Sequence, residues 1–270
     1  MKIGIRWPLK GRNLRERAEF AHKLGFDGIE LGPEHLDDAT SEQILKQIEG
    51  TNLSISAIVG SLNLLNPDPN IRKNAIEIDQ RRILIASELG ASGVIEVPVF
   101  GPPCFPNVPE VISIYDLERK LLIHALKKLA KYTEQTGVSI LLEPLNRYET
   151  HFLNRISQAI EIIREVGTGQ IMILADLFHM NIEEESIERS LKEARDFLGY
   201  IHLADSNRLP PGTGHIDFQK AFKTLKTIGY DGWLTIECEA KVDVEKDMKD
   251  ARYFIKNLWS SVNSSSDLCP

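Results

Sequence analysis

The stretch LLEPLNRYE, residues 141–149, brings an apolar run to an abrupt end in a carboxylate. Residues 138–142 (VSILL) have the composition of a buried strand, and Glu143 and Pro144 follow directly. A desolvated charge without a partner is costly, so a carboxylate at this position requires compensation. Three further apolar runs end in side chains that can bind a metal ion, namely Asp176, His202 and Glu237. The recurrence predicts that the four residues form one site.

Short apolar runs alternate with helical patterns along the chain. The predicted strands cover residues 2–6, 27–31, 53–59, 94–97, 138–142, 171–175, 200–201 and 234–236. The predicted helices cover residues 14–24, 71–89, 114–135, 155–166, 187–198, 218–228 and 244–259, and one more begins at Thr40 or Ser41 in a capping box. Strands that alternate with helices are typical of a parallel sheet.

The number of these units decides between an open sheet and a barrel. Eight units in 270 residues favour an α/β fold with a single domain, a closed (β/α)8 TIM barrel over residues 1–260. No GxGxxG turn follows the first strand, which disfavours a dinucleotide-binding fold. Residues 261–270 are rich in serine, and we expect a disordered tail there.

The composition narrows the classes of partner. The net charge is −7 and no basic tract occurs, so we expect no nucleic-acid partner, because such partners are bound largely through Lys and Arg contacts to phosphate. The first residues lack the apolar core of a signal peptide, and no run approaches a membrane span. Cys104, Cys238 and Cys269 show no ligand or disulfide spacing, which indicates reduced thiols and a cytoplasmic location.

The barrel prediction places the four strand-end residues at one mouth. Side chains at the carboxyl ends of barrel strands converge there. Three carboxylates and one imidazole form a mostly hard ligand set that suits Mn²⁺ or Mg²⁺ and also accepts Co²⁺ or Zn²⁺. The structural alternative is that each acidic residue caps the next helix, an explanation that suits one such residue better than four in succession.

Four motifs carry a resemblance to a known family. They are LLEPLNRYE at residues 141–149, ADLFHMNIEE at 175–184, IHLADSNRLPPGTGHIDF at 201–218 and LTIECEA at 234–240. The chain resembles the xylose isomerase-like TIM barrel superfamily, and within it the D-tagatose 3-epimerase/D-psicose 3-epimerase branch, the ketose 3-epimerases. The resemblance covers the whole barrel, and its most specific part is the second half.

The resemblance implies a role for each matching residue. Glu143 and Glu237 would bind one divalent metal ion, with Mn²⁺ favoured, and would also act as catalytic acid and base, while Asp176 and His202 would complete the metal site. Glu149, His179 and Arg208 would contact the sugar. The implied reaction interconverts free ketoses at carbon 3 through a cis-enediolate, and the implied assembly is a homo-dimer or homo-tetramer.

The chemistry of such a reaction requires this kind of site. Epimerisation removes a proton beside a carbonyl and returns one to the opposite face, so two carboxylates on opposite sides of the sugar are needed. A divalent ion polarises the carbonyl as a Lewis acid. His179 and Arg208 can donate hydrogen bonds to oxygens on which negative charge develops.

Other functions remain open for the same sequence. An aldose–ketose isomerase of the hydroxypyruvate type or an inosose dehydratase would use the same metal site on a different carbon. An endonuclease IV-like enzyme would need more histidine ligands and a basic face. A non-catalytic sugar-binding barrel would not need two opposed glutamates.

Several individual residues also have two interpretations. Glu149 has a surface alternative, an ion pair with Arg147 or Arg155. Trp7, Phe152 and Phe178 suit either the sugar pocket or the core. His215 is interpreted as a loop residue before Asp217, a helix N-cap. Glu30 and Glu96 lie near strand ends and are possible substrate contacts without an assigned role.

Overall fold

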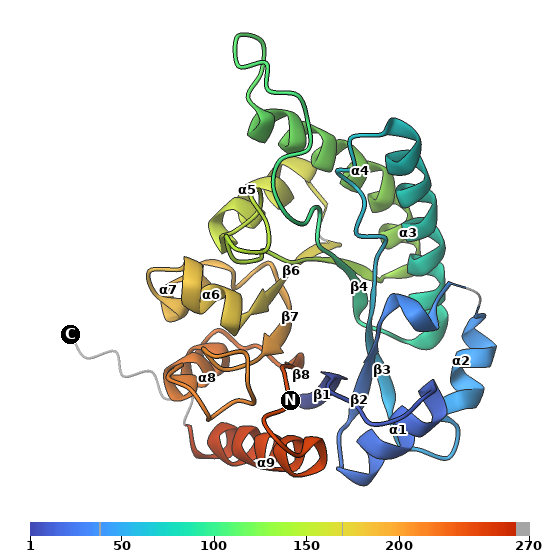
Figure 1. Cartoon of the computed structure of the whole chain (residues 1–270), viewed down its shortest axis with the longest axis vertical. Helices are drawn as coiled ribbons and strands as arrows, with labels where there is room; N and C mark the ends of the chain where they lie inside the picture. The colour runs from blue at the N-terminus through green and yellow to red at the C-terminus, as the bar shows by residue number, and fades with distance from the viewer. Residues whose placement is uncertain (38, 169, 263–270) are drawn as a thin grey trace.

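Eight parallel strands form a closed barrel in the order of the chain, with β8 paired to β1 (Figure 1). The computed structural model describes residues 1–37, 39–168 and 170–262. The strands are β1 (Lys2–Trp7), β2 (Gly28–Leu31), β3 (Ser54–Val59), β4 (Gly93–Glu96), β5 (Ser139–Leu142), β6 (Ile171–Asp176), β7 (Leu198–Leu203) and β8 (Trp233–Glu237). The predicted (β/α)8 TIM barrel is therefore confirmed.

Helices surround the strands on the outside of the barrel (Figure 1). They are α1 (Leu14–Lys23), α2 (Ser41–Ile48), α3 (Pro69–Leu89), α4 (Ile114–Thr136), α5 (Ile156–Val166), α6 (Leu177–Glu183), α7 (Ile187–Glu193), α8 (Phe218–Thr227) and α9 (Val244–Ser261), with a short 3-10 helix η1 (Pro33–His35). Two predicted caps are confirmed: Thr40 and Gln43 form a capping box on α2, and the Asp217 side chain accepts a hydrogen bond from Lys220 N at the start of α8.

The core has two layers, one on each side of the strands. The larger layer lies between the strands and the helices. The smaller layer fills the barrel interior and consists of Ala57, Ile95, Leu141, Leu174, Tyr200 and Trp233. The Tyr200 hydroxyl donates a hydrogen bond to Ser56 Oγ and accepts one from Thr235 Oγ1, both 2.7 Å long. The interior is thus packed solid, as is usual in such barrels.

The seventh unit differs from the prediction. The helix expected at residues 187–198 ends at Glu193, and Leu198 already belongs to β7, where it pairs with Ile173. Gly199 broke the apolar run in the sequence, but a Cβ there would lie 2.8 Å from Met172 Cβ and 2.9 Å from Leu141 Cδ2. Glycine in this strand therefore permits close packing. The helix α6, directly after β6, was not predicted.

Two further expectations concern the serine-rich end of the chain and the absence of a membrane span. Ser261, the first residue of the expected tail, is the last residue of α9, while residues 263–270, with Cys269, lie outside the described part of the chain. Within the described residues, no helix combines the length and the apolar character needed to cross a membrane.

Candidate metal centre

The carboxyl ends of β5 to β8 bring the four predicted ligands together. Glu143 directly follows β5, Asp176 and Glu237 end β6 and β8, and His202 lies near the end of β7, paired in register with Asp176. One ligand atom from each residue lies within 4.8 Å of those of the other three, and all four residues are buried. The expectation that four separate strand ends form one cluster is confirmed. The buried oxygen and imidazole donors form a candidate site for a divalent metal ion.

The His202 ring is held so that one nitrogen faces the other ligands. Its Nδ1 lies 3.3 Å from Glu143 Oε1 and 3.4 Å from Glu237 Oε2, while its Nε2 lies 2.7 Å from Glu30 Oε2. A carboxylate that accepts the N–H of one ring nitrogen leaves the other free to bind a metal ion, which is the usual arrangement around metal-binding histidines. Glu30 thus fits the role of a partner that orients His202.

The electrostatics of the cluster favour positive charge. Burial by itself lowers the pKa of His202, but the Glu30 and Glu237 carboxylates outweigh it and raise the pKa well above its usual value. Buried carboxylates that lie this close together need a compensating cation. The ligand chemistry and the charge of the site therefore both fit a divalent ion.

The two glutamates of the cluster lie in unlike surroundings. Burial raises the pKa of Glu143, and the nearby Glu237 charge adds to this rise, although His202 opposes both. Burial also acts on Glu237, but His202, Arg6 and Arg208 outweigh it and hold the pKa of Glu237 well below its usual value. The surroundings therefore shift the pKa values of the two carboxyl groups in opposite directions.

Two arginines contact the candidate ligands: Arg208 joins two of them, and Arg6 joins one of them to Glu30. Arg208 Nη1 lies 2.7 Å from Asp176 Oδ2, and its Nη2 lies 2.7 Å from Glu237 Oε2. Arg6 Nη1 lies 2.7 Å from Glu30 Oε1, and its Nε lies 3.0 Å from Glu237 Oε1. Each arginine thus holds the Glu237 carboxylate from a different side. The carboxylates that the arginines contact keep further oxygen lone pairs, which can bind a metal ion.

The loop that carries Arg208 is fixed by one buried aspartate. Asp205 accepts hydrogen bonds from the backbone N–H groups of Ser206, Gly212 and Ile216. Arg208 itself has φ 59°, in the left-handed region that is uncommon for residues other than glycine. Its guanidinium lies 4.6 Å from the centre of the Phe178 ring and 5.6 Å from that of Trp7. The loop therefore presents Arg208 to the centre in one defined orientation.

His179 and Glu149 lie beside the cluster and are linked by Asn146. The Asn146 side-chain amide lies 2.8 Å from His179 Nδ1 and 2.9 Å from Glu149 Oε1, and Asn146 N also approaches His179 Nδ1, at 3.3 Å. Amide N–H groups only donate, so Nδ1 accepts and the ring proton is on Nε2. That nitrogen lies 3.5 Å from Asp176 Oδ2. His179 can therefore donate a hydrogen bond at the edge of the centre.

A cavity of about 190 Å³ opens above these residues. Five of the seven residues predicted for the site line it, and Arg6 and Trp7 from β1 do as well. The predicted ones are Glu143, Glu149, His179, Arg208 and Glu237. The structure thus brings all three predicted substrate contacts to the cavity that adjoins the metal cluster. Of the three aromatic candidates, only Trp7 lines this cavity. Phe152 is buried in the core, and Phe178 packs against the core and lies beneath the Arg208 guanidinium.

Sequence reasoning missed Arg6 and Asn146 and left Glu30 without a role. Arg6 and Glu30 lie at or next to the ends of short apolar runs, and a polar residue at such an end is also what predicted the ligands of the second half. Glu96 carries the same signal, but it lies against Asp79 of α3 and against Ser61 rather than in the centre. A charged residue near the end of an apolar run therefore indicates the centre correctly for Glu30 but not for Glu96.

The fold and the centre together define a class, the TIM barrels that carry a divalent-metal site at the carboxyl ends of their strands. The chain belongs to the xylose isomerase-like TIM barrel family, whose model matches residues 18–258. It is 31% identical to the 3-dehydro-D-guloside 4-epimerase of Escherichia coli (strain K12), over 88% of this chain and 92% of that protein. It is 30% identical to the L-ribulose 3-epimerase of Methylomonas sp. (strain DH-1), over 92% and 85%.

A solved structure agrees with these sequence matches. The apo crystal structure of 3-keto-D-glucoside 4-epimerase from E. coli superposes with a TM-score of 0.85 at 28% identity and covers 95% of this chain and 99% of that one. The resemblance to ketose 3-epimerases is confirmed. The chain is also similar to epimerases that are named for carbon 4 of a keto sugar.

Proposed function

We propose that this protein is a metal-dependent sugar epimerase that inverts a carbon next to a carbonyl group. The observation that carries the proposal is the pair Glu143 and Glu237, which line one cavity and lie in opposite electrostatic surroundings. The two side chains come from β5 and β8, which are separated by two strands around the ring. They therefore reach the sugar from different directions, as proton removal and return on opposite faces require.

The two glutamates share the two proton transfers. One of them, in its ionised form, accepts the proton from the carbon. The other returns a proton to the opposite face. The roles exchange in the reverse reaction. His179 Nε2 and the Arg208 guanidinium donate hydrogen bonds to the sugar oxygens on which negative charge builds up.

A divalent ion held by Glu143, Asp176, His202 and Glu237 would supply Lewis-acid polarisation of the substrate carbonyl. Mn²⁺ is the ion that we propose, because the donors are three carboxylates and one imidazole. Cys238, which follows Glu237 in the chain, does not change this assignment. Its side chain packs in the layer between the strands and the helices and is not part of the ligand cluster.

We propose carbon 3 of a free ketose as the reacting position, with carbon 4 of a 3-keto glycoside as the second candidate. The first is supported by the motifs and by relatives such as the L-ribulose 3-epimerase. The second is supported by the 3-dehydro-D-guloside 4-epimerase, which matches this chain over 92% of its own length. In both substrates the inverted carbon is next to a ketone, so the same two glutamates serve either reaction.

Proton exchange in deuterated water tests the proposal. The Mn²⁺-loaded protein is incubated with ketohexoses, a 3-keto glycoside, hydroxypyruvate and an inosose, and NMR identifies which C–H exchanges and which product forms. We expect exchange and inversion at the carbon beside the ketone of a sugar. Carbonyl migration in hydroxypyruvate, or loss of water from the inosose, would instead indicate an isomerase or a dehydratase. Saturable sugar binding with no exchange would indicate a non-catalytic barrel.

A further inference from the structure

The cavity beside the metal centre has two unlike sides. Its charged and polar side chains come from β1, from the ends of β5 to β8 and from the segments that follow these strands. Among the described residues, no polar side chain lines it from β3, from β4 or from the loops after these two strands. The apolar wall on this side consists of Val59, Leu62, Ile95, Val97, Phe100 and Leu145.

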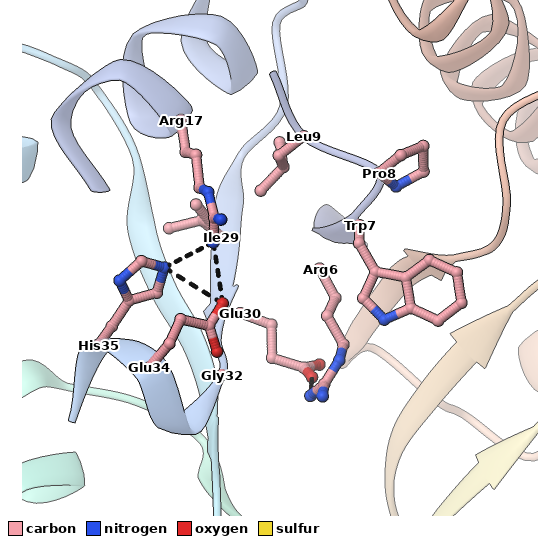
Figure 2. A pocket seen from close by; sticks show the side chains of 10 residues that line it. All are labelled: Arg6, Trp7, Pro8, Leu9, Arg17, Ile29, Glu30, Gly32, Glu34 and His35. Carbon is pink, nitrogen blue, oxygen red and sulfur yellow. Dashed lines mark hydrogen bonds and ion pairs between the residues drawn. The ribbon is translucent and has the colours of Figure 1, made fainter. Parts of the chain in front are cut away.

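The charged side converges on the metal cluster. Arg6 pairs with Glu30 and Glu237. It also lines a neighbouring cavity, and Figure 2 shows its guanidinium there, beside the Glu30 carboxylate. Arg208 pairs with Asp176 and Glu237. Because these groups surround the ligand cluster, the reacting carbons of a sugar belong on this side, and its remaining carbons extend toward the apolar wall.

The base of the apolar wall is buried. Val59, Ile95, Val97 and Leu145 are between 2% and 5% exposed, and Ile95 also packs in the barrel interior. The carbonyl oxygen of Ile95 already accepts a hydrogen bond of 2.7 Å from Gly60 N. A sugar hydroxyl against this wall would lose its contact with water without gaining a side-chain partner, which is unfavourable. A methyl group in the same place would bury apolar surface, which is favourable.

Leu62 is presented to the cavity by a strained backbone. Its φ is 59°, in the left-handed region that is uncommon for residues other than glycine and is best tolerated by asparagine and aspartate. The preceding residue is fixed, because Ser61 N lies 2.7 Å from Asp79 Oδ1 and Ser61 Oγ lies 2.8 Å from Asp79 Oδ2. Ser61 N also lies 3.2 Å from Glu96 Oε1. Strain of this kind persists only where the surroundings hold it and is commonest at functional sites.

Phe100 is also held in place by its neighbours. Gly101 N donates a hydrogen bond of 2.7 Å to Glu149 O, and His151 N donates one of 3.2 Å to Gly101 O, so the loop after β4 is fastened to the loop after β5. The Phe100 side chain lines the cavity although it is 49% exposed. An aromatic side chain at such an opening can cover an apolar group of a ligand.

We propose that the apolar wall selects a keto sugar that ends in a methyl group, so that the preferred substrate is a 6-deoxy keto sugar. This inference rests on the proposed function, because it places the reacting carbons beside Glu143 and Glu237. The methyl group packs against Leu62 and Val97. The hydroxyls between it and the reacting carbon face Glu149, whose side chain is 41% exposed.

Pairs of sugars that differ by one oxygen atom test the proposal. They are L-tagatose and 6-deoxy-L-tagatose, L-fructose and 6-deoxy-L-fructose, D-fructose and 6-deoxy-D-fructose, and the methyl glycosides of 3-ketoglucose and 6-deoxy-3-ketoglucose. Deuterium exchange beside the ketone gives kcat/KM for each sugar with the Mn²⁺-loaded protein. In each pair that reacts, we expect wild type to prefer the deoxy sugar by roughly tenfold or more, mainly through KM, because the missing oxygen is the one without a partner.

Two variants add a polar group to the apolar wall. Leu62→Asn places an amide there and suits the left-handed backbone, and Val97→Thr adds a hydroxyl to a side chain of similar shape. Each is expected to lower the preference for the deoxy sugar roughly tenfold. Val99→Thr is the matched control, because Val99 packs against the outer core and does not line the cavity, so its preference equals that of wild type. Thermal unfolding checks that each variant is folded.

The outcomes separate the two proposals. Equal kcat/KM within the reacting pairs, a preference for the sugar that keeps the oxygen, or a deoxy preference that neither folded variant lowers overturns the inference and leaves the epimerase proposal intact. If no probe exchanges, the epimerase proposal fails and the inference fails with it.

Discussion

The two halves of the barrel contribute different parts of the same centre. Strands β5 to β8 bring together the four candidate metal ligands, whereas β1 and β2 provide Arg6, which pairs with Glu237, and Glu30, which pairs with His202. A ligand must be a good electron-pair donor at a strand end, so its residue type is restricted. A supporting residue only has to complete a hydrogen bond, and its role becomes visible only once the register is known.

Removing one catalytic group in the second half should produce the largest effect. Glu143→Gln keeps an oxygen for the metal ion but cannot hold or deliver the proton, so we expect proton exchange beside the ketone to fall by roughly 10²–10⁴-fold. Calorimetric titration with Mn²⁺ should still show saturable binding. Glu118→Gln is the control, because Glu118 is also buried but pairs with His151 outside the centre. Exchange near the wild-type rate in Glu143→Gln would refute its proposed role.

A change in the first half should act on the metal ion instead. Glu30→Ala removes the acceptor of the His202 Nε2 proton and one of the two carboxylates that hold Arg6, so we expect the Mn²⁺ affinity to fall roughly 10–100-fold. Glu30→Gln keeps an acceptor oxygen and should lose less. Titration followed by the EPR signal of free Mn²⁺ measures both.

The matched control for that comparison is Glu34→Gln. Glu34 lies on η1, four residues further along the chain, and pairs with Arg17 rather than with a candidate ligand. If Glu30→Ala binds Mn²⁺ as tightly as this control does, Glu30 does not position His202. The proposal that the first half supports the ligands of the second half is then wrong.

The same contrast explains what the sequence predicted. The strand–helix alternation gave the barrel, and polar residues at the ends of four apolar runs gave the ligand cluster. Glu30 and Glu96 look alike in sequence, but their neighbours point to different layers. Ile95 packs in the barrel interior, so Glu96 points outward, whereas Ile29 packs in the outer layer, so Glu30 points inward. Successive side chains of a strand point to opposite faces, so the direction of each glutamate is known only once it is known which residues of its strand face the barrel interior.

One tyrosine connects the two halves below the mouth. Tyr200 of β7 bonds to Ser56 of β3 and to Thr235 of β8 inside the barrel. Tyr200→Phe leaves both hydroxyls without this partner, so we expect the free energy of unfolding to fall by about 1–2 kcal/mol. Urea unfolding measures the loss, with Tyr253→Phe as control because Tyr253 is 68% exposed. Equal stability of the two variants would show that the interior hydroxyls find other partners.

The outward-facing carboxyl group of the first half should appear in the pH dependence of stability. Glu96 is buried against Asp79, and burial, with the Asp79 charge, raises the pKa of Glu96 well above its usual value. The folded protein therefore holds a proton that the unfolded chain releases at lower pH. The contribution of this group is complete below the pKa of the unfolded chain and is lost as the pH rises through the folded pKa, by at most about 1.4 kcal/mol per pH unit.

Glu96→Gln isolates that contribution, because the amide keeps a hydrogen-bond donor toward Asp79 and cannot lose a proton. Urea unfolding of wild type and variant, from the unfolded glutamate pKa of about 4.3 upward, should give a smaller decline for the variant as the pH rises. The same experiment on Glu30→Gln provides the comparison, because Glu30 is paired with Arg6 and His202 rather than with a carboxyl group. Parallel pH profiles for wild type and Glu96→Gln would mean that Glu96 is already ionised in the folded barrel, with its charge balanced by Arg82, whose charge lowers the pKa of Glu96.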